Sequence, residues 1–162
     1  ADVPDEIKDK LDFIFVDNKF AYIACEWLST INLIQIWDVE EGELVDSFGT
    51  GDEISLATGI AQGPNGDIYV SDWYEARVQR YDGETHEFVE TFVQADGEMS
   101  APTKMQFGPG PYLYVLSAGG LIRYDSESGH FVDVFVPIGS GGLDTPRGFV
   151  FRNKATDPEP EP

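Results

Sequence analysis

The chain has 162 residues, of which 41% are hydrophobic and 13% aromatic, and this is enough apolar material for one domain with a buried core. It carries 10 Lys and Arg against 30 Asp and Glu, a formal net charge of −20 at pH 7. Such a surface repels nucleic-acid backbones and anionic membranes, so neither is expected as a partner. We interpret the acidity first as a solvated or salt-adapted surface, and second as a surface for cations or basic partners.

No stretch of the sequence approaches the roughly 20 apolar residues that span a bilayer. The sequence starts at Ala1 without a methionine, as a secreted protein does after signal cleavage or as an engineered product does. From this start we expect an extracellular, cell-surface or periplasmic location. The single cysteine, Cys25, lies in an apolar run and has no partner for an internal disulfide, which is typical of a small buried side chain.

In chain order, the predicted elements are a short lead-in, three related units, one extra strand and a tail. The only helix candidate, Pro4 to Leu11, is short and charged. The tail alternates Pro and Glu, which favours an extended, hydrated segment. The expected boundaries are 1–10 for the lead-in, about 11–57, 58–101 and 102–145 for the units, 147–151 for the strand and 152–162 for the tail.

The three units are related by a repeat in which an aromatic residue is followed by aspartate. The markers lie 44 and 43 residues apart, and they are Trp37-Asp38, Tyr81-Asp82 and Tyr124-Asp125. A phenylalanine closes each unit at the same spacing: Phe48, Phe92 and Phe135. A period of this length is typical of propeller blades or of helical arrays.

The composition of each unit decides between these two architectures. Short runs rich in Val, Ile, Tyr and Phe are separated by Gly, Pro, Asn or Asp, which is the pattern of strands and turns. Helical repeats need apolar residues three and four positions apart and fewer Gly and Pro. In the middle unit we predict strands near 59–62, 67–71, 77–81 and 88–93. The predicted fold class is therefore all-β, with three four-stranded β-propeller blades and the first strand of a fourth.

The most informative local feature is an acidic residue followed by tryptophan. Matching Tyr22–Trp27 with Ile68–Trp73 places two such pairs at equivalent strand ends of neighbouring blades. Loops at one position of neighbouring blades open on the same face of a ring, so we predict a binding face for a sugar, a peptide or a protein. The alternative is that both tryptophans pack over the blade beneath. The predicted face consists of Glu26, Trp27, Asp72, Trp73 and Tyr74.

Three segments of the second unit resemble the NHL repeat and the related streptogramin-lyase-like blades: Thr58–Ala61, Gly66–Asp72 and Arg77–Asp82. The end of the third unit, 135–148, is similar to NHL-like propellers of exported bacterial proteins. The resemblance implies a fold that is usually six-bladed. It also implies functions that range from scaffolding and protein or RNA binding to lyase and lactonase chemistry, so the fold alone leaves the function open.

Three blades are fewer than the roughly four to eight that close a propeller. The chain is then either part of a longer propeller or a part-propeller that is completed by copies of itself or by another chain, as a closed ring or a filament. The predicted assembly strand repeats the opening strand of a blade and comprises Arg147, Phe149, Val150 and Phe151. The expected function is a non-catalytic binding and assembly module with a protein partner, most simply a homo-oligomer.

Catalytic motifs are missing from the sequence. His86 and His130 fall in turns at the rim, where exposed side chains are expected, and no Gly-x-Ser-x-Gly motif occurs. Two histidines and one cysteine make a poor zinc site. Calcium remains open because acidic residues are plentiful, although no Asp-x-Asp-x-Asp-Gly loop occurs. We predict no enzyme activity and no cofactor, and the alternative is a fragment of a metal-dependent propeller enzyme of the lyase or lactonase type.

Overall fold

The computed structural model describes residues 13–17, 19–24, 34–50 and 52–152. These residues form three four-stranded antiparallel sheets, one for each predicted unit, which confirms the all-β fold class with four-stranded blades. The helix candidate Pro4 to Leu11 lies outside the described residues. Within the described ranges the helical element is a 3-10 turn, Ser140–Gly142, and no helix has the length and apolarity needed to cross a bilayer.

Each sheet takes four consecutive strands in sequence order. Blade 1 consists of β1 (Phe13–Val16), β2 (Phe20–Ala24), β3 (Ile34–Asp38) and β4 (Leu44–Phe48). Blade 2 consists of β5 (Ala57–Gln62), β6 (Ile68–Asp72), β7 (Arg77–Tyr81) and β8 (Phe88–Val93). Blade 3 consists of β9 (Lys104–Phe107), β10 (Tyr112–Ser117), β11 (Gly120–Asp125) and β12 (Phe131–Pro137).

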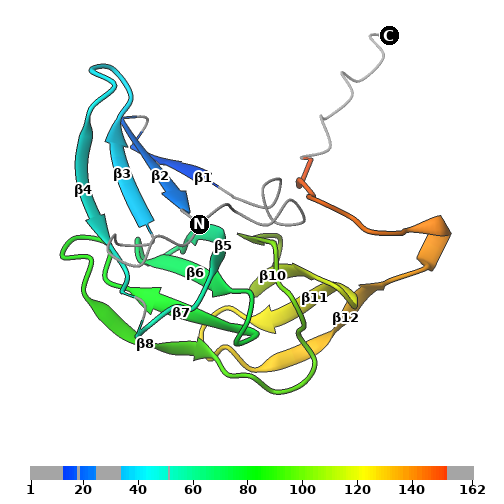
Figure 1. Ribbon diagram of the computed structural model, residues 1–162. Helices are drawn as coiled ribbons and strands as arrows, with labels where there is room; N and C mark the ends of the chain where they lie inside the picture. Colours follow the sequence, from blue (N-terminus) through cyan, green and yellow to red (C-terminus); the bar gives the residue numbers. More distant parts are fainter. Residues whose placement is uncertain (1–12, 18, 25–33, 51, 153–162) are drawn as a thin grey trace, which may run out of the picture.

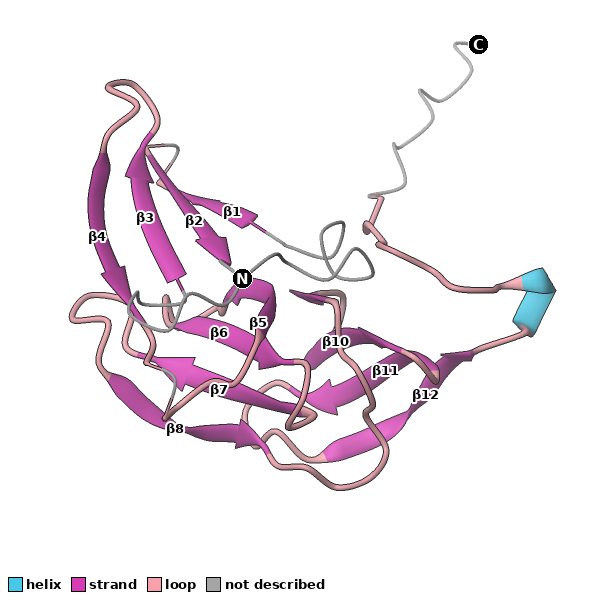
Figure 2. Ribbon diagram, in the orientation of Figure 1, coloured by secondary structure: helices cyan, strands magenta, loops and turns pink. Residues whose placement is uncertain are grey.

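The three blades stand side by side around a common centre, with the first strand of each blade innermost and the fourth outermost (Figure 1). The inner strand β5 contacts both β1 and β9, so the blades are adjacent in chain order. The strands of blades 2 and 3 are joined by short turns, and longer described paths connect β8 to β9 and follow β12 (Figure 2). The arc leaves one sector of the ring without a blade among the described residues (Figure 1).

The hydrophobic core lies between blades, because each sheet is apolar on both faces. We call the face turned toward the next blade in the chain the trailing face and the opposite one the leading face. The trailing face of blade 1 packs on the leading face of blade 2 through Tyr22, Ile36 and Phe48 against Ile60, Ile68 and Val70. The trailing face of blade 2 packs on blade 3 through Tyr69, Val78 and Phe92 against Met105, Leu113 and Val115. All residues of β6 are buried, as expected for a central sheet between two others.

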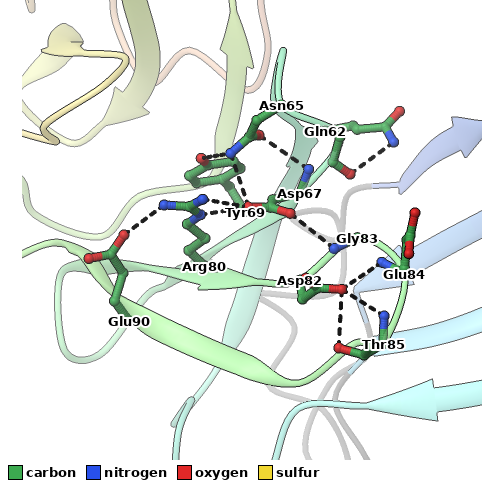
Figure 3. A network of polar contacts seen from close by, with 11 residues as sticks. Gln62, Asn65, Asp67, Tyr69, Arg80, Asp82, Gly83, Glu84, Thr85 and Glu90 are labelled. Carbon is green, nitrogen blue, oxygen red and sulfur yellow. Dashed lines mark hydrogen bonds and ion pairs between the residues drawn. The ribbon is translucent and has the colours of Figure 1, made fainter.

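The aspartate of each aromatic-Asp marker folds the hairpin between the third and fourth strands. Asp82 accepts hydrogen bonds from the backbone N–H groups of Glu84 and Thr85 at 2.9 and 2.7 Å and from the Thr85 hydroxyl at 3.1 Å (Figure 3). Asp38 and Asp125 accept equivalent bonds in the other two blades. These Asx turns explain why the repeat keeps an aspartate here, since its side chain satisfies the turn's own N–H groups.

A second polar network holds the inner hairpin of blade 2 against its outer strands. The guanidinium of Arg80 donates to Asp67 at 2.7 Å and to Glu90 at 2.9 Å (Figure 3). Asp67 also accepts from the backbone N–H of Gly83, and Asn65 donates to Asp67 and to the Tyr69 hydroxyl. The network fixes the end of the blade that carries the β5–β6 turn and the β7–β8 hairpin, and it uses no residue of the predicted binding face.

The strand pairing corrects the sequence alignment of blade 1 by one residue. Ala21 lies opposite Trp37, as Ile68 lies opposite Tyr81, so Tyr22 is the counterpart of Tyr69. The alignment of Tyr22 with Ile68 was therefore wrong, because it was carried across the longer loop of blade 1. A shift of one residue moves a side chain to the other face of a sheet. In the corrected register the trailing faces carry Tyr22, Tyr69 and Tyr114 at one position.

Candidate binding and assembly surfaces

Asp72, predicted as part of an exposed binding face, is fully buried. Its carboxylate accepts hydrogen bonds from the backbone N–H groups of Ser55 and Leu56 at 2.9 and 3.2 Å, and it forms an ion pair with Arg77 at 3.4 Å. A buried carboxylate is tolerated when donors and a cation surround it in this way. Asp72 therefore anchors the segment that leads into β5, and this corrects its assignment to a ligand-contacting surface.

Ser117 plays the corresponding part in blade 3. Its hydroxyl accepts from the N–H of Ser100 at 3.1 Å and donates to the Ser100 carbonyl at 2.9 Å. The backbone follows the same rule, because Trp73 donates its N–H to Leu56 and Ala118 donates its N–H to Ser100, each at 2.9 Å. The repeat alignment carried the signal for this clamp, since Asp72 and Ser117 occupy the same position at the end of the second strand.

The remaining described residues of the predicted binding face are Trp73 and Tyr74. Their rings meet edge to face with centroids 5.1 Å apart, and Tyr74 is 58% exposed while Trp73 is partly buried. Glu26 and Trp27 lie outside the described residues. Because Ala24 is the counterpart of Ser71 in the corrected register, Glu26 and Trp27 are not the sequence equivalents of Asp72 and Trp73. The structure thus brings one aromatic pair together and does not test the second.

His86 is not an exposed turn residue, as the sequence suggested, but a wedge between blades 1 and 2. Its ring stacks on Phe48 at 4.9 Å, its Nε2 lies 3.0 Å from the Tyr22 hydroxyl, and its Nδ1 lies 3.6 Å from Asp46. The backbone is left-handed there (φ 59°), at the position where the other two hairpins use Gly42 and Gly129. Strain of this kind is uncommon outside glycine, and here it aims a side chain into the blade interface. His130, by contrast, is exposed.

Among the described residues, no blade covers the trailing face of blade 3, where Phe135 is exposed. The Arg123 guanidinium lies over the rings of Tyr112 and Phe135 at 4.6 and 4.7 Å and is held by Asp133 at 2.8 Å. The hydrogen bonds to Asp133 raise the pKa of Arg123 and lower the pKa of Asp133. Tyr112, Arg123 and Phe135 therefore form a surface of two rings held by one cation, which we call the platform. Aromatic and arginine side chains are common in protein contacts.

The predicted assembly strand, residues 147–151, does not form a strand, which corrects the expectation of a regular element there. A strand needs a ladder partner, and no second strand of a fourth blade lies among the described residues. Arg147 is exposed. The segment nevertheless docks on blade 3: the Phe151 ring meets Tyr114 at 4.6 Å, as Phe107 of β9 meets Tyr69 of blade 2 at 4.9 Å.

A glycine permits this docking. A Cβ on Gly108 would collide with the Phe151 and Tyr114 rings, so only a residue without a side chain fits beneath them. Phe149 packs on the same surface, while Val150 between them is 81% exposed. Residues 149–151 thus occupy the place of a fourth inner strand, with alternate side chains turned toward and away from blade 3.

The inner strands enclose a cavity of about 460 Å³ near the centre of the arc. β1 contributes Phe13 and Ile14, and the docked segment contributes Phe149 and Val150. The remaining wall comes from β5 and β9 and consists of Ile60, Ala61, Gln62, Lys104, Met105, Gln106 and Phe107. Within the described part of the chain, no group of three or more His, Cys, Asp or Glu side chains is placed to hold a metal ion.

Comparisons with known proteins establish the fold. No family model and no curated protein sequence matches the chain. A catalytically inactive virginiamycin B lyase from Staphylococcus aureus, crystallised with quinupristin, is similar over 80% of this chain and 42% of its own, with 19% identity and a TM-score of 0.59. An auxiliary nutrient binding protein from Bacteroides ovatus is similar over 74% of this chain and 29% of its own, with 20% identity and a TM-score of 0.54. Hydrazine synthase from Kuenenia stuttgartiensis is similar over 72% of this chain and 32% of its own, with 14% identity and a TM-score of 0.55.

These similarities extend to the propeller architecture and no further, because all three identities are low. The chain spans less than half the length of each of these structures. It is a partial β-propeller of three blades within the described residues. A fold of this kind suits a binding or assembly module, and it is equally the scaffold of a lyase.

Proposed function

We propose that the chain is a non-catalytic binding and assembly module whose blade 3 receives further propeller blades from a protein partner. The partner is a copy of this chain or another chain, and the NHL-like character and an extracellular, cell-surface or periplasmic location are parts of the same proposal. The observation that carries it is one phenylalanine of the repeat. Phe48 and Phe92 are each 6% exposed, whereas Phe135, at the same spacing from its aromatic-Asp marker, is 48% exposed.

The following blade accounts for this difference. His86 of blade 2 stacks on Phe48, and the hairpin of blade 3 brings Gly129 against the backbone of Phe92 so closely that a Cβ would collide with it. In each case the hairpin between the third and fourth strands of the next blade covers the phenylalanine. Phe135 lacks such a cover among the described residues, although it meets Tyr114 edge to face at 5.6 Å as Phe92 meets Tyr69 at 4.9 Å.

The exposed platform has the chemistry of a binding surface. Tyr112, Arg123 and Phe135 are of the residue types that contribute most to protein contacts, and they are pre-arranged by stacking and by the ion pair with Asp133. Pre-arranged side chains lose little conformational entropy when a partner binds. A further blade would cover the platform in the same way as blades 2 and 3 cover their predecessors.

The test is the mass of the assembly isolated from its natural source without denaturation, compared with the mass of the chain it contains. We expect further blades in the assembly, supplied by additional copies, by a second chain or by a longer form of this chain. A natural assembly that consists of one copy with nothing beyond residue 162 would overturn the proposal.

A pair of variants localises the contact. Phe135→Glu places a charge on the platform and is expected to weaken the natural assembly at least about tenfold, because a charge is desolvated when the blade is covered. Val89→Glu is the matched control, since Val89 lies on the outer strand of blade 2 with nearly the same exposure, 47%. Equal effects of the two substitutions would show that the platform is not the contact.

A further inference from the structure

Residues 149–151 share their pattern with one inner strand in particular. The segment reads Phe149-Val150-Phe151, and β1 begins Phe13-Ile14-Phe15. The inner strands of the other blades read Ile60-Ala61-Gln62 and Met105-Gln106-Phe107 at the same positions, without two phenylalanines around a β-branched residue. By sequence, residues 149–151 resemble the inner strand of blade 1 more than they resemble the inner strand of blade 2 or blade 3.

The strand register of β1 and β9, together with the contacts of Phe151, places the two segments at the same position of a blade. Phe13 lies opposite Ile23 in β2, and Met105 lies opposite Val115 in β10, which is the counterpart of Ile23. The Phe151 ring meets Tyr114 as the Phe107 ring meets Tyr69, so Phe151 takes the place of Phe107 one blade further on, and Phe149, two residues earlier, takes the place of Met105. Phe149 and Phe13 are therefore register equivalents, as are Val150 and Ile14.

The two segments also lie at the same depth in the ring. Phe13 and Ile14 line the central cavity from one side, and Phe149 and Val150 line it too. Figure 1 shows the path after β12 leaving the arc and returning toward the centre, on the side of the open sector. An inner strand of the next blade would have to stand at this place.

The side chain of Val150 indicates what such a strand lacks. Its equivalent, Ile14, packs against the core between blades 1 and 2, while Val150 is 81% exposed. Phe149 and Phe151 already face blade 3. Val150 would be buried only if strands two to four of a blade stood beside residues 149–151, followed by a further blade that packs on them as blade 2 packs on blade 1.

We infer that residues 149–151 of one copy pair with β2 of a second copy, in the place of that copy's β1. Blade 3 of the first copy is then followed by a composite blade, in which the inner strand comes from one chain and β2–β4 come from the other. A second copy fits because its β2 already pairs with a Phe-Ile-Phe strand in this register. The inference rests on the proposed function and names the partner and the strand that it contributes.

The exchange costs little free energy because residues 149–151 replace a β1 strand of similar sequence. β1 contributes only four residues to its sheet, so its release breaks one short ladder. The incoming segment replaces the first three of the four ladder pairs with β2 and keeps its contacts with Tyr114, so most of the backbone pairing that is lost is recovered. If the exchange is reciprocal, two copies provide six blades, and if it is not, longer assemblies form.

Because the chain is strongly acidic, association of two copies depends on the salt concentration. Each copy carries a formal charge of −20, so two copies repel each other across solvent. The Debye length falls from about 8 Å at 0.15 M salt to about 3 Å at 1 M. We expect association to strengthen as salt is raised over about this range.

The first test is the solution mass of the full chain, measured by light scattering over a series of protein concentrations at both salt levels. We expect a mass of two or more copies, and we expect Val150→Pro to weaken association at least about tenfold, because proline removes the N–H that the ladder needs. Asp144→Pro is the control: it places proline in the exposed connection before the segment and should leave the association unchanged.

The second test identifies the pairing directly. All chains carry Cys25→Ala, and a chain with Ala21→Cys is mixed with a chain with Phe151→Cys, so any cross-link joins two copies. Ala21 lies opposite Phe15 in the structure, hence opposite Phe151 after exchange, and facing cysteines in paired strands satisfy disulfide geometry. A mixture of Ala21→Cys with Val150→Cys is the control, because adjacent positions point to opposite faces and should cross-link at least about tenfold more slowly.

A chain that stays monomeric at every concentration and salt level would overturn the exchange, as would association that Val150→Pro leaves intact. Equal cross-linking of the two mixtures would overturn the register. A monomeric purified chain that occurs in its natural source with additional blades from another chain would refute the exchange and leave the proposed function standing.

Discussion

At the scale of single residues, one position of the repeat has the same structural role in blades 2 and 3, although it is an aspartate in one and a serine in the other. Asp72 and Ser117 both hold the segment that enters their blade, the first with a carboxylate that accepts from two backbone N–H groups and the second with a hydroxyl that accepts from one and donates to a carbonyl. The arginine beside Asp72 balances its charge, and Ser117 needs no such partner. The position is therefore a structural clamp, which leaves the neighbouring Tyr74 as the exposed aromatic of that loop.

Asp72→Ala tests this clamp. The substitution leaves three backbone donors and the Arg77 guanidinium without their acceptor. Breaking a buried pair of this kind lowers the free energy of unfolding by about 3 kcal/mol. Asp72→Asn keeps one acceptor oxygen and should cost less. Thermal and urea unfolding measure both, with Glu75→Ala on the exposed part of the same loop as control, expected to change the free energy by about 0.5 kcal/mol or less. A loss no larger than that of the control would contradict the structural role.

At the scale of the element, the aspartates of the three Asx hairpins make the free energy of unfolding depend on pH. Backbone hydrogen bonds from Thr85 and Glu84 lower the pKa of Asp82, those from Glu41 and Glu40 lower the pKa of Asp38, and the Ser128 hydroxyl and N–H lower the pKa of Asp125. A carboxyl group whose pKa is lower in the folded state stabilises that state above its ordinary pKa. This stabilisation disappears as the pH falls through the folded-state pKa.

We therefore expect the midpoint of thermal unfolding to fall between about pH 5 and about pH 2, with part of the fall due to Asp82. Asp82→Asn keeps an acceptor oxygen at every pH, so the difference in melting temperature between the wild type and this variant should shrink as the pH falls. Glu84→Gln removes the same charge from the same turn and serves as control. A difference that stays constant across this range would show that the turn hydrogen bonds do not depend on the ionised carboxylate.

The strands of the middle blade were predictable because each is a short apolar run between turn residues. The predicted 59–62, 67–71, 77–81 and 88–93 differ by no more than two residues at either end from β5–β8. The register of blade 1 was not predictable from the spacing of its markers, because the loop after β2 is longer and a period contains no information on where extra residues enter. The partly buried position of His86 was missed for another reason: a turn residue is exposed within its own blade, and only the packing of blade 2 on blade 1 covers it.

At the scale of the whole molecule, one kind of contact between blades stabilises the chain at two places, and under the proposed function it also forms on the uncovered face of blade 3. A blade is covered when the inner strand and the hairpin of the next blade pack on its tyrosine and phenylalanine, as Phe107 packs on Tyr69 and Gly129 on Phe92. Tyr69 has Phe107 and Phe92 around it in this way, and Tyr114 has Phe151 and Phe135. The difference is that Phe107 belongs to a paired strand, whereas Phe151 is held by side-chain packing in a segment with no ladder.

Phe107→Ala and Phe151→Ala should therefore separate stability from assembly. The first opens a cavity between two blades and is expected to lower the free energy of unfolding of the isolated chain by about 3 kcal/mol. The second removes a contact of a segment without strand pairing, so its cost in the isolated chain is about 1 kcal/mol. It also removes the ring that holds residues 149–151 on Tyr114, so we expect association to weaken. Chemical unfolding of dilute protein and light scattering at high concentration measure the two effects. The order would be reversed if residues 149–151 were an ordinary part of the monomer core, because Phe151→Ala would then unfold the chain as readily as Phe107→Ala and leave its association unchanged.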